Sequence, residues 1–224
     1  MARFTGFDLF LLAACGIGYA YYANSGGASA TGDTVVIDGF AFPESLKMAG
    51  VAQQVTGGGT RIKYGVAKVY AVALYIDAAA AAGSLRSFAA TEPPKTPKFF
   101  QTIVDGVFSK TLYLQFHRSV SAEAMVEALN EAMNKRLPPA SVAKFAAAVY
   151  KAIPASIAKG DQLFFMCKSS SLMIGAGKAF ASVTLREKGV CAALFDVYYG
   201  KAPVAPAAKE GAAAGFAKRF YLKK

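Results

Sequence analysis

The sequence predicts an α+β fold: one mainly antiparallel β-sheet with helices segregated to one of its sides. The order of elements is the first reason. Strand-like apolar runs come first, two helical segments follow, and a further pair of strand-like runs precedes the last helices. The second reason is the long run 68–76, which is apolar on both faces, with bulky side chains on one and alanines on the other. We therefore expect this strand to be covered on both sides.

The composition is that of one folded domain. The chain has 224 residues, of which 54% are hydrophobic and 17% charged. This is enough to bury a sizeable core and excludes disorder of the whole chain. The formal net charge of +11 favours anionic partners, such as a nucleic acid, an anionic membrane surface or an anionic small molecule. Because no dense basic run interleaved with aromatic residues is found, we do not expect nucleic-acid binding.

The first 30 residues have the features of a targeting segment. Arg3 gives a weakly positive start, residues 9–23 carry no charge, and the small residues at 28–30 fit a cleavage site. The uncharged stretch is shorter than the roughly 20 residues that span a membrane. We expect residues 1–30 to be a cleaved signal peptide, a retained membrane anchor or a bipartite organelle leader, and residues 31–224 to be the domain. Each of these puts the chain on a secretory or organellar route, plastids included.

Strands dominate the first part of the domain. The run 34–37 leads to a turn at Asp38-Gly39, and a second short strand follows. We expect the three glycines 57–59 to break the chain, and Tyr64-Gly65 to make a second bend before the long strand 68–76. Prolines then interrupt regular structure in the connection that follows.

The second part alternates between strands and helices. A stripe at i, i+3 and i+4 makes the helix after Ser141 the clearest of these elements. The short GxG stretch 175–180 is read as a hairpin turn, because no strand–turn–helix context supports a phosphate loop. The predicted elements are, in order, a strand at 111–120, helices capped by Ser121 and Ser141, strands at 162–168 and 178–187 around a Ser/Gly-rich link, a helix at 190–199, and a basic helix from Pro206.

Standard catalytic and metal-binding motifs are missing. The three cysteines have no metal-ligand spacing, and we expect Cys167 and Cys191 to be buried thiols. His117 is the only histidine, which excludes a multi-histidine metal site and weakens any Ser-His or Cys-His hydrolase. We read it as a half-exposed strand residue. No metal and no cofactor is predicted.

Several segments, taken in this order, resemble the chalcone isomerase-like family: VVIDGFAFPESL, GGGTRIKYGVAKVYAVALYID, LYLQFHRSVSAEAMVEAL, KGDQLFF and CAALFDVYYGKAPV. The resemblance covers about residues 34–207 and is strongest to the non-catalytic fatty-acid-binding branch. It implies an open-faced sandwich, in which a large antiparallel β-sheet carries a layer of α-helices on one face and a ligand cleft lies between them.

The resemblance also implies a ligand site at Arg61 and Tyr70, the positions that hold the ligand carboxylate in the fatty-acid-binding members. A guanidinium can bind a carboxylate through two parallel charge-assisted hydrogen bonds, and a phenol can add a third. Arg61 and Tyr70 are nine residues apart and would face opposite sides of an unbroken strand. The prediction therefore requires that the bend at Tyr64-Gly65 resets the register.

The enzymes of the family, which cyclise a chalcone, need further polar groups. In the implied alignment these positions fall at Ser121, Ala128 and Cys191, and an alanine cannot donate a hydrogen bond. A shift of one helical turn would instead bring Asn130 or Asn134 to the site. Ser121 and Cys191 are kept as weaker candidates for ligand contact, and no residue is assigned as catalytic.

The sequence thus predicts a protein that binds fatty acids or similar amphipathic carboxylates. Two alternatives stay open: a chalcone–flavanone isomerase, and a membrane-tethered structural or interaction protein without catalysis.

Overall fold

The computed structural model describes residues 28–90, 96–177 and 181–221. Its strands are β1 (Ala28–Ile37), β2 (Phe40–Met48), β3 (Val51–Lys63), β4 (Ala67–Ile76), β5 (Lys110–Phe116), β6 (Val120–Ser121), β7 (Ser156–Ile157), β8 (Gln162–Lys168), β9 (Ser171–Ala176) and β10 (Ala181–Leu185). Its α-helices are α1 (Ala78–Leu85), α2 (Pro97–Asp105), α3 (Ala122–Met133), α4 (Pro139–Ala152), α5 (Val190–Tyr199) and α6 (Pro206–Phe216). Short helical turns, Arg86–Ala90 and Ala217–Tyr221, follow α1 and α6.

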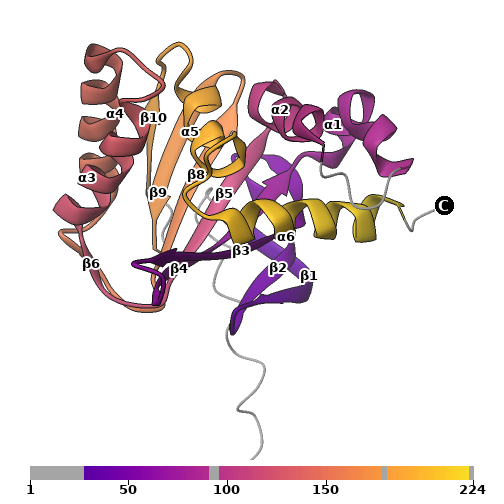
Figure 1. The fold of residues 1–224 in the computed structure, drawn as a ribbon, viewed down its shortest axis with the longest axis horizontal. Helices are drawn as coiled ribbons and strands as arrows, with labels where there is room; N and C mark the ends of the chain where they lie inside the picture. Colours follow the sequence, from indigo (N-terminus) through magenta and orange to yellow (C-terminus); the bar gives the residue numbers. More distant parts are fainter. Residues whose placement is uncertain (1–27, 91–95, 178–180, 222–224) are drawn as a thin grey trace, which may run out of the picture.

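One large antiparallel sheet organises the molecule. Within the described residues it has eight strands in the order β1-β2-β3-β4-β5-β8-β9-β10, while β6 and β7 form a separate pair. The sheet stays open, and the helices gather along one of its faces (Figure 1). This α+β arrangement confirms the predicted fold class.

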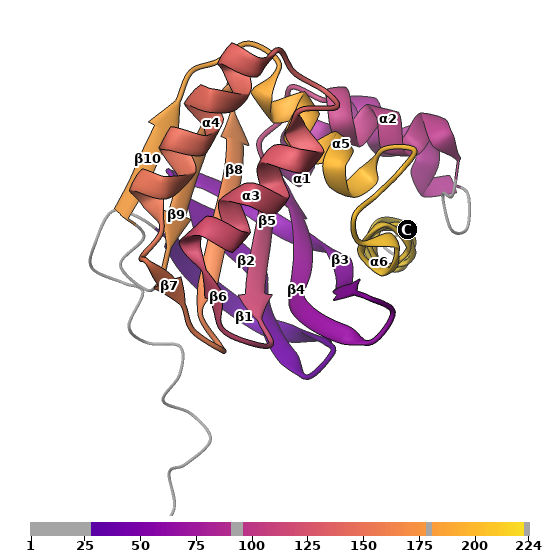
Figure 2. The same cartoon turned by 60° about the vertical axis from the view of Figure 1, so that its left-hand side comes forward.

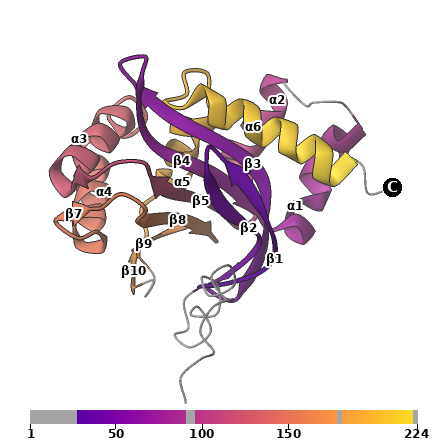
Figure 3. The same ribbon diagram turned by 90° about the horizontal axis from the view of Figure 1, so that it is seen from below.

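Strand β4 lies between two hydrophobic cores and contributes alternate residues to each. The even-numbered residues 70–76 pack against the helices, and the odd-numbered residues 71–75 face a second core made with β1, β2 and β3. The second core forms because the sheet curls, so that the N-terminal strands fold over this face (Figure 3). The Tyr75 hydroxyl, for example, donates a hydrogen bond of 2.7 Å to the Pro43 carbonyl of β2. Both faces of β4 are thus covered, as its two apolar faces predicted.

The glycines 57–59 do not break the chain, and that prediction was wrong. They lie inside β3, where α6 packs directly on the strand backbone. A Cβ on Gly211 would overlap the Gly58 carbonyl oxygen, and one on Gly215 would overlap the Thr56 carbonyl oxygen. The glycines are therefore needed on both elements for the close approach of helix and strand.

The predicted Ser/Gly-rich link also contains a strand. β9 pairs with β8 on one side and with β10 on the other, and Ser169 and Ser170 form the preceding turn with positive φ angles of 48° and 64°. Apolar residues in this link, among them Leu172 and Ile174, are buried in the core. Residues 178–180 lie outside the described residues, but β9 and β10 pair antiparallel on either side of them, as a hairpin requires.

Cys167 and Cys191 form a disulfide bond, so the prediction of two buried thiols was wrong. The bond ties β8 to the start of α5 across 24 residues of sequence, with the two Cα atoms 5.9 Å apart. Sequence spacing held no sign of this pairing, because only the packing of α5 against the sheet brings the two residues together.

Only the last three residues of the predicted targeting segment belong to the described residues. Residues 1–27 lie outside the described residues, whereas Ala28–Ala30, the predicted cleavage site, belong to β1 and pair with β2. In the described part of the chain, no helix combines the length and the apolar character needed to cross a membrane.

Candidate ligand-binding cleft

Arg61 and Tyr70 lie directly opposite each other on β3 and β4. Side chains of directly opposed residues point to the same face of a sheet. The required change of register was predicted at the turn around Tyr64-Gly65. In the structure a bulge makes it: Ile62 pairs with Lys68 but Arg61 pairs with Tyr70, so that Val69 is an extra residue. Both side chains therefore face the helix layer.

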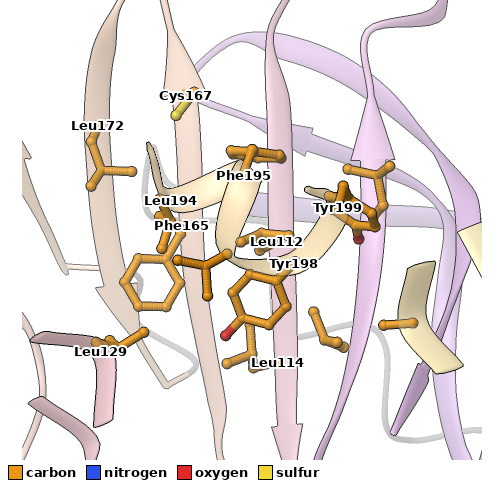
Figure 4. Packing of buried hydrophobic residues seen from close by; sticks show 14 of the residues in the cluster. Leu112, Leu114, Leu129, Phe165, Cys167, Leu172, Leu194, Phe195, Tyr198 and Tyr199 are labelled. Carbon is orange, nitrogen blue, oxygen red and sulfur yellow. The ribbon is translucent and has the colours of Figure 1, made fainter. Parts of the chain in front are cut away.

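The Arg61 guanidinium lies over the Tyr70 ring, with its central carbon 5.7 Å from the ring centroid. Tyr70 is only 1% exposed, and its ring also meets the Phe116 ring edge-on at 5.4 Å. Its hydroxyl shares a hydrogen bond of 2.8 Å with the Tyr198 hydroxyl of α5. Tyr198 lies on the side of α5 that faces the sheet, beside Leu112 and Leu114 (Figure 4). A half-buried cation thus stands above a fully buried pair of phenols.

A cleft of about 440 Å³ opens on Arg61. This volume lies in the range of ordinary small-molecule sites. Helix α3 and the segment after α5 form much of its wall, and both contribute small apolar side chains as well as charged ones. The lining residues are Arg61, Gln101, Ala128, Glu131, Ala132, Lys135, Arg136, Asp196, Lys201, Ala202 and Val204. Tyr70 is not part of the wall, because it lies beneath Arg61.

The ion pairs of the cleft leave Arg61 without a carboxylate. Arg136 binds Asp196 at 2.6 Å and also donates to the Ala132 carbonyl, so the Asp196 charge is already engaged. Among the described residues, no carboxylate lies within 4.0 Å of the Arg61 guanidinium. Glu131 is the other acid in the wall. The cleft therefore presents a half-buried guanidinium that an anion could neutralise.

The Arg61 side chain stays charged in this setting. Burial acts to lower the pKa of Arg61, but the neighbouring Tyr70 and Tyr198 hydroxyls and the Glu131 carboxylate act in the other direction, and the net shift is upward. The cleft thus keeps a fixed positive charge over the pH range in which a carboxylic acid is ionised.

Tyr198 stays protonated for a related reason. Burial, and then the contact with Tyr70, raise the pKa of Tyr198 well above its ordinary value, and the nearby Arg61 only partly opposes this. If Tyr198 donates its proton to Tyr70, the Tyr70 proton is free for another acceptor. Sequence reasoning missed Tyr198, which lay on the predicted apolar stripe of its helix with no sign that its hydroxyl would meet Tyr70.

The other predicted contacts lie elsewhere. The Ser121 hydroxyl caps α3 and accepts a hydrogen bond of 3.2 Å from the Ala124 amide. Cys191 is held in the disulfide bond. Neither residue lines the cleft, whereas Ala128, which cannot donate a side-chain hydrogen bond, does. The structure thus brings Arg61 and Tyr70 together but not Ser121 or Cys191.

His117 belongs to a separate polar cluster at one end of the sheet. Its Nε2 lies 3.1 Å from the Asp38 carboxylate, and its ring packs on the Phe40 ring at 4.6 Å. Lys68 and Thr60 also bind Asp38, at 2.6 and 2.7 Å. The cluster links the β1–β2 turn to β3 and β4. His117 was predicted to be a half-exposed strand residue, but it lies in the bend just after β5 and its side chain is only 17% exposed.

Comparisons with known proteins agree with this architecture. A solved structure of a fatty-acid binding protein of Arabidopsis thaliana is similar, with a TM-score of 0.69 and 18% sequence identity, covering 85% of this chain and 100% of that chain. At this identity the likeness shows a shared fold. A search of curated proteins finds no match. A family model described as chalcone isomerase-like matches residues 34–211, most of the chain. The chain therefore belongs to the chalcone isomerase-like family.

Proposed function

We propose that this protein binds fatty acids or similar amphipathic carboxylates in the cleft at Arg61. The observation that carries the proposal is the half-buried Arg61 guanidinium, which opens on a cleft of about 440 Å³ and has no carboxylate partner among the described residues. A ligand carboxylate would supply the missing counter-ion through two parallel hydrogen bonds. Tyr70 lies beneath Arg61 and outside the cleft wall, so its part would be to hold the guanidinium in place for the ligand.

The apolar part of the cleft would take the tail of such a ligand. Ala128 and Ala132 of α3 stand in the wall with Ala202 and Val204 of the segment after α5. Each methylene that leaves water contributes about 0.8 kcal/mol to binding, before the cost of association is subtracted. The tail would thus lie along the four apolar residues of a wall whose other seven residues are polar or charged.

The direct test is mass spectrometry of the purified protein under denaturing conditions. We expect a co-purified fatty acid in the wild type and its loss in Arg61→Ala. Arg186→Ala is the matched control, because Arg186 is exposed and does not line the cleft. An Arg61→Ala protein that carries as much fatty acid as the wild type would contradict the proposal that Arg61 binds the carboxylate.

The isomerase alternative has its own measurement. When the protein is mixed with a chalcone, we expect the chalcone absorbance to decay no faster than it does without protein. A faster, protein-dependent decay would favour the enzyme, and its loss in Arg61→Ala would place that activity in the same cleft.

A further inference from the structure

The turn between β3 and β4 carries an unusual group of exposed apolar side chains. Ile62, Tyr64 and Val66 are 49%, 84% and 85% exposed, within five residues of one another. The turn lies at the periphery of the molecule, beyond the body of the sheet (Figures 2 and 3). We call Ile62, Lys63, Tyr64 and Val66 the hairpin tip.

The turn accounts for the backbone of Tyr64 but not for its side chain. Its φ angle is +54°, in the left-handed region that favours glycine and asparagine over a bulky aromatic residue. The ring gains little from packing, since its one described contact is with the Lys63 ammonium, 5.2 Å from the ring centroid. A similar φ occurs at the first position of other hairpin turns, at Asp38 and Ala49, so the exposed aromatic ring, rather than the backbone, is the feature that points to a contact outside the molecule.

Free cations accompany the apolar side chains. Lys63 belongs to the tip. Arg118 follows His117, whose amide donates a hydrogen bond of 2.9 Å to the carbonyl of Val69, three residues beyond Val66 on β4. Both side chains are exposed, and among the described residues neither has a carboxylate within 4.0 Å. Lys68, by contrast, is engaged by Asp38. The surface therefore combines an apolar, aromatic point with positive charge.

We propose that the hairpin tip docks on an anionic lipid bilayer. Ile62, Tyr64 and Val66 would enter the boundary between headgroups and acyl chains, where a tyrosine ring is favourably placed. Lys63 and Arg118 would meet the lipid phosphates. A stable protein partner needs about 800 Å² of surface on each side, far more than one hairpin turn offers, whereas a few apolar side chains with nearby cations are enough for a membrane surface.

Docking would bring the ligand cleft close to the bilayer. Arg61 precedes Ile62 on β3, so the cleft and the tip share one strand. The proposal goes beyond ligand binding and does not depend on it, since docking is measured without any fatty acid. Failure of the Arg61 test and failure of the docking test are therefore separate results.

The absence of tryptophan from the chain makes a site-specific test possible. In full-length Tyr64→Trp, we expect the fluorescence to shift to shorter wavelength on mixing with vesicles of phosphatidylcholine and phosphatidylglycerol. Brominated acyl chains should quench it. The matched control is Val107→Trp, at a position that is 88% exposed in the connection between α2 and β5. Its spectrum should not change, and membrane binding by any other part of the chain would affect both proteins alike.

A second pair of variants tests the affinity. Tyr64→Asn suits the left-handed backbone, so Tyr64→Asn with Val66→Ser should fold and should weaken sedimentation with the same vesicles by about tenfold or more. Val107→Ser should leave sedimentation with the vesicles unchanged. An unchanged Tyr64→Trp spectrum, or equal quenching at Tyr64→Trp and Val107→Trp, would overturn the proposal. A wavelength shift that grows with protein concentration in the absence of vesicles would overturn it too, because the tip would then contact a second copy of the chain.

Discussion

One inserted residue, Val69, determines the geometry of the candidate site. Without the bulge at this position, Arg61 would pair with Val69, and Tyr70 would point to the opposite face of the sheet. Because of it, the guanidinium and the phenol share one face, and α5 can add Tyr198 beneath them. The site thus depends on a local backbone irregularity as much as on the identity of its side chains.

The pair of phenols gives a prediction at this scale. Tyr198→Phe removes the hydrogen-bond partner of the buried Tyr70 hydroxyl and so loosens the phenol over which the Arg61 guanidinium lies. We expect fatty-acid affinity to weaken by about threefold to tenfold, measured by titration calorimetry. Tyr199→Phe is the matched control on the same helix, since the buried Tyr199 hydroxyl has no hydrogen-bond partner among the described residues. Equal affinities for the wild type and Tyr198→Phe would contradict the role of the pair.

The contact of α6 with β3 is the feature of interest at the scale of elements. Glycines on both partners let the helix approach the strand at backbone distance: Gly57–Gly59 on the strand, and Gly211 and Gly215 on the helix. In an isolated helix these glycines would cost stability relative to alanine. Here they determine how closely α6 packs on β3, the strand that carries Arg61.

Substitution of a contact glycine should therefore destabilise the protein. In Gly215→Ala the new methyl group would overlap the Thr56 carbonyl, and we expect a loss of about 3 kcal/mol or more in the free energy of unfolding by urea. Gly83→Ala in α1 is the control, because no atom of another element lies within 4 Å of the place that its new methyl group would take. That change should stabilise the protein by up to about 1 kcal/mol. Similar effects at the two positions would mean that α6 does not pack on β3 in this way.

At the scale of the whole molecule, the disulfide bond joins the two layers. Cys167 belongs to the sheet and Cys191 to α5, the helix that carries Tyr198. The bond therefore restrains the helix layer relative to the sheet at the element that completes the candidate site.

Removal of this bond should weaken the whole fold. For a cross-link that spans 24 residues, chain entropy gives a loss of about 3 kcal/mol in Cys167→Ala with Cys191→Ala. A reducing agent should lower the urea midpoint of the wild type and leave that of the double variant unchanged. The matched control is Cys15→Ala, which should respond to the reducing agent as the wild type does. Alkylation of both Cys167 and Cys191 in the native protein before reduction would contradict the bond.

The sequence by itself determined the fold class and the approximate place of most elements. These follow from local physics, because the alternation of apolar residues, helix capping and proline positions act within a few residues of one another. The stripe after Ser141 predicted α4, and the two apolar faces of 68–76 predicted a strand covered on both sides. The predicted cap at Ser141 was wrong, because α4 already begins at Pro139 and the Ser141 hydroxyl donates to Glu187. A resemblance in several ordered segments pointed to the family, and it singled out Arg61 and Tyr70.

Tertiary structure alone decided the features that depend on contacts between distant parts of the chain. The glycines of β3 look like a chain break until α6, some 150 residues later, packs on them. Tyr198 becomes a polar neighbour of Tyr70 only when α5 lies on the sheet, and the same packing brings Cys191 to Cys167. Such pairings leave no periodic trace in the sequence, since each depends on how two elements are placed in space rather than on the spacing of residues within either one.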